Sequence, residues 1–129
     1  MLALVCATGV FCANAVFGAE LNAVGAREIE QLLARLVVSG CRFQRNGSWY
    51  EAAEARDHLE KKYRYLLNQR LIGSAEDFVV AGATKSSMSG KPYWVQCGTH
   101  QPIQSAVWMA LQLHEVRVST KRGDLPKTR

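Results

Sequence analysis

The sequence predicts an α+β domain in which three to four helices pack on a small antiparallel sheet. Two segments place apolar side chains at intervals of three and four residues, which is the period of an amphipathic helix. Two other segments, residues 41–50 and 93–97, alternate apolar and polar side chains, and the first is interrupted by Asn46-Gly47. A hairpin and one further strand therefore supply the sheet.

The first helix is expected over residues 24–38. Its apolar positions recur on one face and are Ile29, Leu32, Leu33, Leu36 and Val37. Ser39-Gly40 ends the pattern.

The segment that follows predicts a hairpin over residues 41–50. Asn-Gly is the strongest short-range signal for a two-residue hairpin turn. A turn of this length places Arg45 opposite Ser48 and Phe43 opposite Tyr50.

Two helices are expected next. Residues 51–69 carry an apolar stripe and two acid-before-base pairs four residues apart, Asp57 with Lys61 and Glu60 with Arg64. Ser48 and Glu51 have the spacing of a capping box. Ser74 is a helix cap followed by acidic residues, which indicates a short helix ending near Gly82.

The last part of the domain combines a strand and a helix. Residues 93–97 form an alternating strand whose Tyr93, Val95 and Cys97 share one face. Residues 103–117 are apolar on most sides and predict a helix packed over the sheet.

The N-terminal segment is typical of a secretory signal peptide. Residues 2–19 are uncharged and apolar and end in small residues, with Ala19 as the preferred cleavage position and Ala15 as an alternative. A retained membrane anchor is the competing interpretation. The expected organisation is a signal peptide at 1–19, one α+β domain at 20–118 and a basic flexible tail at 119–129. We therefore expect a periplasmic or secreted bacterial protein without stable membrane insertion after cleavage.

The positive charge is concentrated at the C-terminus. The chain has a net charge of +5, yet residues 117–129 hold five basic side chains against Asp124 alone, so the rest is nearly neutral. This distribution argues against a nucleic-acid groove. It fits a solvated tail or an electrostatic contact with anionic lipid or cell-wall polymer.

The mature chain would retain Cys41 and Cys97. In an oxidising compartment, a lone pair of cysteines in a small domain favours a disulfide, here closing a loop of about 57 residues. A close Cys-x-x-Cys motif is missing from the sequence, which makes a structural role more plausible than redox catalysis.

The histidines do not predict a metal site, because none has a second ligand at a recognised spacing, and no cofactor is implied. His114 falls on an apolar helix face and is expected to be a buried core histidine. His58 lies four residues after Glu54 and four before Lys62, so the three could line one helix edge or form a solvated charge network.

The polar loop at 84–92 admits three interpretations. Backbone amides around Ser87, Ser89 and Gly90, beside Lys91, could form a nest for an anion. A loop serine could instead act as a nucleophile with Lys91 or His58 as base, although neither Ser-x-x-Lys nor Gly-x-Ser-x-Gly is present there. Ordinary turn chemistry explains the composition most simply.

Four ordered blocks resemble a family of small exported bacterial proteins of unknown function, the YfeK-like family. The blocks are RNGSWY at 45–50, AEARDHLEKKY at 53–63, SAEDFV at 74–79 and SSMSGKPY at 86–93, and the resemblance spans residues 27–117. It brings no activity with it. The positions that recur by this resemblance are Arg45, Asn46, Gly47, Tyr50, His58, Leu59, Lys62, Tyr63, Glu76, Asp77, Phe78, Ser87, Ser89, Gly90, Lys91 and Tyr93.

These observations favour a non-catalytic module that binds an anionic ligand or an envelope partner. The expected binding residues are basic or small and polar, namely Arg45, Asn46, His58, Lys62, Ser87, Ser89, Gly90 and Lys91. The alternatives are a small hydrolase or transferase that uses a loop serine with His58 or Lys91, and a partner site on an apolar patch around Trp49, Trp94 or Trp108.

Overall fold

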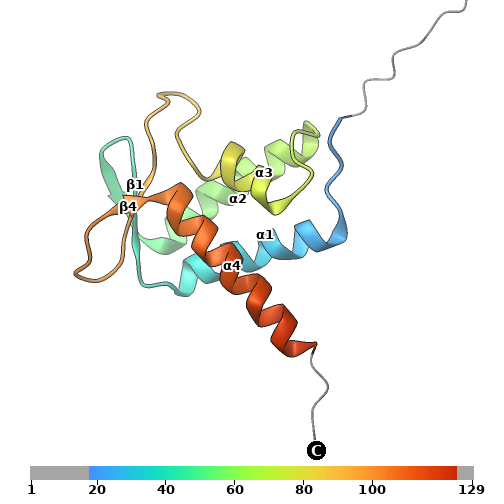
Figure 1. Ribbon diagram of the computed structural model, residues 1–129. Helices are drawn as coiled ribbons and strands as arrows, with labels where there is room; N and C mark the ends of the chain where they lie inside the picture. The colour runs from blue at the N-terminus through green and yellow to red at the C-terminus, as the bar shows by residue number, and fades with distance from the viewer. Residues whose placement is uncertain (1–17, 125–129) are drawn as a thin grey trace, which may run out of the picture.

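The computed structural model describes residues 18–124 and has the expected α+β class, with four helices packed with a four-stranded antiparallel sheet (Figure 1). The expected signal segment lies almost wholly outside the described residues. The sheet lies at one end of the group of helices (Figure 1). In chain order the elements are α1 (Ala23–Val38), β1 (Arg42–Arg45), β2 (Ser48–Tyr50), α2 (Ala52–Asn68), α3 (Ala75–Gly82), β3 (Trp94–Gln96), β4 (Ile103–Gln104) and α4 (Ser105–Gly123).

The sheet has the strand order β2-β1-β3-β4, with every pair antiparallel. Asn46 and Gly47 both adopt positive φ angles, 50° and 82°, as a two-residue hairpin turn requires. The predicted register is confirmed: Arg45 pairs with Ser48, and Phe43 pairs with Tyr50. The sequence did not predict β4, because its two residues are too few to show alternation.

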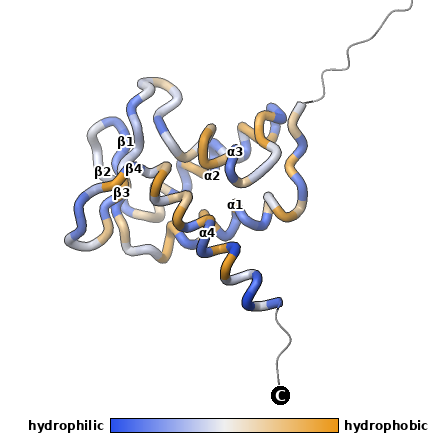
Figure 2. Tube along the Cα trace, viewed as in Figure 1, coloured by the Kyte–Doolittle hydropathy of each residue, from blue (hydrophilic) through white to orange (hydrophobic). Residues whose placement is uncertain are grey.

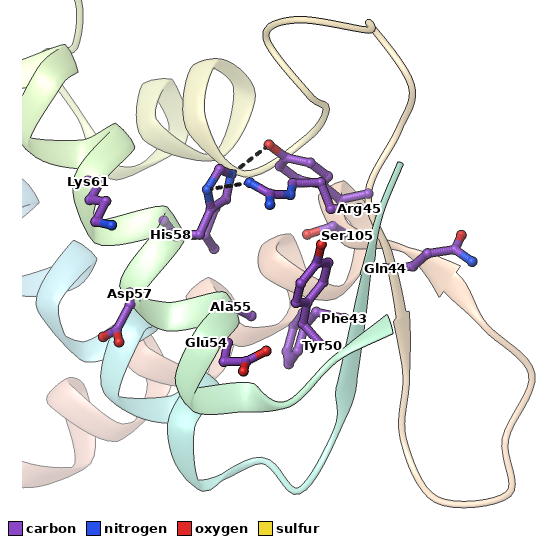
Figure 3. A pocket seen from close by; sticks show the side chains of 12 residues that line it. Phe43, Gln44, Arg45, Tyr50, Glu54, Ala55, Asp57, His58, Lys61 and Ser105 are labelled. Atoms are coloured by element: carbon purple, nitrogen blue, oxygen red, sulfur yellow. Dashed lines mark hydrogen bonds between the residues drawn. The ribbon is translucent and has the colours of Figure 1, made fainter. Parts of the chain in front are cut away.

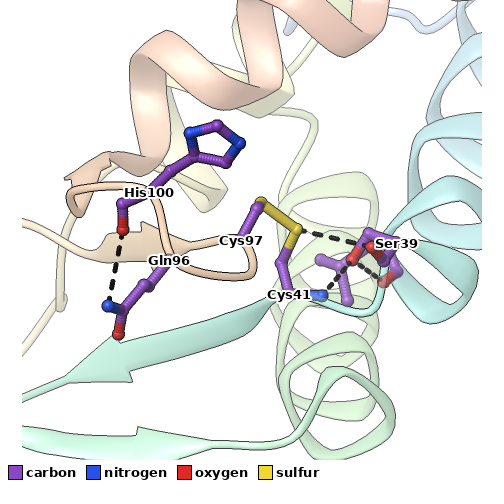
Figure 4. Close-up of a disulfide and its surroundings, with 6 residues drawn as sticks. Ser39, Cys41, Gln96, Cys97 and His100 are labelled. Atoms are coloured by element: carbon purple, nitrogen blue, oxygen red, sulfur yellow. Dashed lines mark hydrogen bonds between the residues drawn. A yellow bond between two sulfur atoms is a disulfide. The ribbon is translucent and has the colours of Figure 1, made fainter.

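The predicted disulfide is present between Cys41 and Cys97 (Figure 4). Arg42 pairs with Gln96 across β1 and β3, so the residues just beyond this pair on each strand face each other. Their Cα atoms are 4.2 Å apart, the close approach that antiparallel neighbours make at a pair without backbone hydrogen bonds. The bridge thus fastens the end of α1 to the sheet.

The helix ends confirm some expectations and correct others. Ser74 caps α3 by accepting a hydrogen bond from the Asp77 amide at 3.1 Å. The capping box at Ser48 and Glu51 is wrong, because Glu51 is the N-cap of α2 without a side-chain cap bond and Ser48 belongs to β2. The predicted pair of Glu60 and Arg64 is present at 2.7 Å.

The last helix is displaced from its expected span of 103–117. It begins at Ser105 and continues to Gly123, so residues 119–123, expected as part of a flexible tail, are helical. Basic side chains at Lys121 and Arg122 suit the last turn of a helix, where the macrodipole is negative. Residues 125–129 lie outside the described part of the chain.

The core is enclosed by the four helices and one face of the sheet. Its largest fully buried side chains include Phe78 from α3, Met109 from α4 and Ile29 from α1. Figure 2 shows apolar and polar residues alternating along α4. His114 lies on the exposed side of this helix, which contradicts its expected place in the core.

Aromatic contacts join the helices to the sheet. Phe43 of β1 meets Trp108 of α4 edge to face, with ring centroids 5.5 Å apart. Trp108 is buried and Trp49 and Trp94 are half-buried, so the three indoles do not form the exposed apolar patch considered above.

Arg117 connects three helices. Its guanidinium donates to Glu28 of α1 and pairs with Glu76 of α3, and these bonds raise the pKa of the Arg117 side chain. The sequence grouped Arg117 with the charges of the C-terminal segment, whereas the fold uses it as a clamp. Within residues 18–124, no helix has both the length and the apolar character needed to cross a membrane.

Replacing both cysteines, Cys41→Ala with Cys97→Ala, is predicted to lower the free energy of unfolding by about 4 kcal/mol. The bridge spans a sequence separation of 56 residues, and opening it returns that loop entropy to the unfolded chain. Urea unfolding of the variant and of reduced wild-type protein should show the same loss. A loss below about 1 kcal/mol in both would contradict the assigned role.

Candidate functional site

A pocket of about 380 Å³ lies between α2 and the β1–β2 hairpin (Figure 3). We define the cation pocket by six of its lining residues, which come from β1, β2, α2 and the segment before β3: Arg45, Tyr50, Glu54, His58, Lys61 and Tyr93. Phe43 and Ser105 also line it.

Local structure places these side chains. On β1, alternation directs Phe43 and Arg45 to the same face of the sheet. On α2, Glu54, His58 and Lys61 are three or four residues apart and therefore share one side of the helix. Because α2 follows the hairpin after a single residue, this side faces the strands.

His58 is held between two partners. Arg45 Nη1 lies 2.9 Å from His58 Nδ1, and Tyr93 Oη lies 3.0 Å from His58 Nε2 (Figure 3). A guanidinium can only donate, so Nδ1 must accept and carries no proton. The neutral ring then has its proton on Nε2, which donates to Tyr93.

Tyr93 joins His58 to Lys62. Its hydroxyl oxygen accepts hydrogen bonds from His58 Nε2 and, at 3.3 Å, from Lys62 Nζ. Lys62 Nζ also donates to the Lys85 carbonyl at 3.0 Å. With its oxygen accepting two bonds, the phenol still has its own O–H to donate.

The charge around His58 is unbalanced. Among the described residues, Arg45, Lys61 and Lys62 form no ion pair with a carboxylate. Of the two carboxylates that line the pocket, Asp57 pairs with Arg56 at 3.5 Å, and Glu54 lies one helical turn before His58. Arg45 and Lys62 are half-buried and Lys61 is exposed, and none of the three is ion-paired within the part of the chain described.

The pKa values of His58, Lys62 and Tyr93 are shifted by burial and by the neighbouring positive charges. Burial lowers the pKa of His58, and the positive charges of Arg45, Lys62 and Lys61 lower it further. Burial, followed by the charge of Arg45, also lowers the pKa of Lys62. Burial raises the pKa of the Tyr93 phenol, against the opposing effect of Arg45. His58 and Tyr93 are thus both uncharged near neutral pH, in agreement with the hydrogen bonds.

The polar loop is fastened to the hairpin. Ser89 Oγ donates to Asn46 Oδ1 at 2.5 Å, and the amides of Ser89, Gly90 and Lys91 donate to Ser86 or Ser89 within the loop. Gly90 has a φ of +71°, which favours glycine at this turn. The amides of Ser89, Gly90 and Lys91 therefore stabilise the loop itself.

The structure brings together part of the predicted set. Arg45, His58 and Lys62 are linked through Tyr93. Ser87 lines a second hollow of about 230 Å³, which it shares with His58, Lys61 and Lys62. Asn46 and Ser89 bond to each other, and Gly90 and Lys91 line neither hollow.

Four of the six residues that define the cation pocket were absent from the predicted binding set, namely Tyr50, Glu54, Lys61 and Tyr93. Glu54 had been placed only at one helix edge with His58 and Lys62. Tyr50 and Tyr93 were signalled only as recurrent positions of the family resemblance. Lys61 could have been found from its spacing, because it lies three residues after His58 and so shares its side of α2.

The structure does not pair a loop serine with His58, as the hydrolase or transferase alternative would require. Both ring nitrogens of His58 are engaged, by Arg45 and Tyr93, and the Ser89 hydroxyl donates to Asn46. Within residues 18–124, no three His, Cys, Asp or Glu side chains gather where they could hold a metal ion.

Fold and site together define a small α+β domain with a pocket beside its sheet that is lined by Arg45, His58 and Lys61. The chain belongs to a family of unknown function, DUF5329, whose profile matches residues 24–117. This range nearly coincides with that of the resemblance noted from the sequence blocks, and the match supports membership of a family of unknown function and nothing finer. Comparison with curated proteins and with solved structures gave no match.

His58 should titrate below its ordinary value of 6.5, and Arg45→Gln should raise its pKa toward that value. Because the folded-state pKa lies below the unfolded one, the contribution of His58 to stability is complete above pH 6.5 and declines as the pH falls toward the lowered value. An NMR titration of the His58 ring protons measures both pKa values. A wild-type pKa above 6.5, unchanged in the variant, would contradict the site geometry.

Proposed function

We propose that this protein is an exported, non-catalytic module that binds a small ligand through a carboxylate, sulfate or phosphate group in the cation pocket. The observation that carries the proposal is the group of donors around His58, namely Arg45, Lys61 and Lys62, which form no ion pair with any carboxylate among residues 18–124.

The donors converge on one space. The Arg45 guanidinium uses Nη1 for His58, and among the described residues its Nε and Nη2 make no hydrogen bond, which leaves one fork edge for an oxyanion. Lys61 and the Tyr93 hydroxyl line the same pocket. Such a set suits an anion whose oxygens only accept hydrogen bonds.

Electrostatics favours occupancy by an anion. Burial of positive charge is costly, and burial accordingly lowers the pKa of Lys62 and the pKa of His58, whose ring is thereby kept neutral in the free protein. A bound oxyanion would offset this cost with hydrogen bonds between charged groups, which are about twice as strong as neutral ones.

The walls indicate the rest of the ligand. Phe43, Tyr50 and Tyr93 give the pocket aromatic surface, and Arg45 lies over the Tyr50 ring at 5.2 Å. A volume of about 380 Å³ is in the range of small-molecule sites. We therefore favour a small anionic ligand, or the anionic end of a larger envelope component, over a broad protein partner.

Export is supported by two features. The apolar, uncharged segment at 2–19 is typical of a signal peptide. A structural disulfide such as Cys41–Cys97 forms and persists in an oxidising compartment. The hydrolase or transferase alternative gains no support, because His58 is not paired with a loop serine.

Arg45→Gln is predicted to weaken binding of sulfate, used as a probe anion, roughly tenfold to hundredfold, because charged hydrogen bonds to the anion are lost. Lys121→Gln removes the same charge at the opposite end of α4 from Ser105 and should leave the affinity unchanged. Isothermal titration calorimetry measures both variants, and a melting curve checks their folding. If both variants lost affinity equally, the loss would be an effect of the net charge of the protein, and the proposed site would be contradicted.

Expression of the full sequence in a bacterial host should yield protein in the periplasmic fraction with a mass that lacks residues 1–19. Its two remaining cysteines should resist alkylation until a reductant is added, because they are joined. Intact-mass spectrometry of the fractionated cells tests both points. An uncleaved chain in the cytoplasm with reactive thiols would refute export.

A further inference from the structure

We propose that the cation pocket takes up a proton together with its anion, and that Nδ1 of His58 is the atom that receives it. This inference rests on the proposed function and specifies how the same site is controlled by pH.

The free site blocks protonation by its geometry. The one nitrogen of His58 that has no proton is the acceptor of the Arg45 hydrogen bond, at 2.9 Å. A proton added there would point at a guanidinium, which has no acceptor atom. Protonation therefore requires that Arg45 turns away or that an acceptor enters between the two groups.

An oxyanion is such an acceptor. If the oxyanion lies between Arg45 and His58, one of its oxygens accepts a hydrogen bond from Arg45 and another accepts a hydrogen bond from the new Nδ1–H of His58. His58 Nε2–H keeps its bond to Tyr93, so the ring need not rotate. The Arg45–His58 bond is exchanged for two bonds to the anion.

The charges around His58 determine whether anion binding favours or disfavours its protonation. The titratable groups around His58 are Arg45 from β1, Tyr50 from β2, Tyr93 before β3, and Glu54, Asp57, Lys61, Lys62 and Tyr65 from α2, while α4 contributes the uncharged Ser105. Three cations face two carboxylates, one of which is paired with Arg56. An added anion offsets this excess, so the imidazolium is favoured in the complex and disfavoured in the free protein.

Thermodynamic linkage converts this preference into a pH dependence. If the anion raises the pKa of His58, protonation must raise the affinity for the anion by the same factor. The affinity therefore increases as the pH falls through the pKa of the complex, by at most about tenfold per pH unit, and levels off below the pKa of the free protein. The site would capture its ligand in acid and release it as the pH rises.

The experiment is calorimetric titration of the protein with sulfate, whose own protonation state does not change in the range used. Titrations from about pH 8 to about pH 5, the range in which histidine charges, in buffers of different ionisation enthalpy give the affinity and the number of protons taken up. We expect uptake of up to about one proton per sulfate and a tighter complex at lower pH.

His58→Asn is the matched variant, because its amide oxygen can still accept from Arg45 and its side chain does not titrate. It should bind sulfate with an affinity that no longer depends on pH and without proton uptake. Should this variant fail to fold, the ¹⁵N shifts of the His58 ring in wild-type protein, with and without sulfate, show directly whether Nδ1 gains a proton.

The outcomes separate the two proposals. Sulfate binding that is equally tight across the pH range, with no proton uptake, overturns the coupling and leaves the proposed function standing. Coupling that persists in His58→Asn overturns the assignment to His58. Absence of sulfate binding at every pH refutes the proposed function itself.

Discussion

The site depends on one hydrogen bond, from the Arg45 guanidinium to Nδ1 of His58. Arginine cannot accept a hydrogen bond and remains charged, so its position beside the ring determines which nitrogen carries the proton. The Nε2–H that remains selects Tyr93 as its acceptor, and Tyr93 in turn gathers Lys62. A single donor thus orients a chain of four polar side chains, three of which, Arg45, His58 and Tyr93, line the cation pocket.

The fold brings three segments that are distant in the sequence together at this hydrogen bond. The hairpin turn at Asn46-Gly47 ends β1 next to Arg45, and α2 begins almost at once, which sets His58 against the strands. The backbone of Tyr93 is held on both sides, since its amide donates to Thr84 and its carbonyl accepts from the Ser105 amide. The disulfide fastens β1 to β3 at the far end of the same pairing, so the distance between Arg45 and Tyr93 is maintained by the sheet.

The sequence predicted what local patterns encode and missed what only the fold brings together. Periodicity located α1 and α2, and the Ser74 cap located α3. Asn46-Gly47 with alternation predicted the register of Phe43 and Arg45. All of these signals are local. The two residues of β4 are too few to show alternation, and they form a strand only because they pair with β3. The extension of α4 to Gly123 runs through polar and basic residues that carry no apolar periodicity. Lys62 and His58 were expected at one helix edge, but their link through Tyr93 crosses a sequence separation of more than thirty residues. In the loop at 86–91, the amides of Ser89 and Lys91 bond to serine hydroxyls of the same loop, a pairing that composition alone does not reveal.

The most direct test of this account is the protonation state of the His58 ring in the free protein, read from its ¹⁵N chemical shifts near neutral pH. The account predicts an unprotonated Nδ1 and a protonated Nε2, since Arg45 donates to the first and Tyr93 accepts from the second. A ring protonated on both nitrogens, or on Nδ1 alone, would contradict it, because the Arg45 bond on which the pocket is built would then be absent.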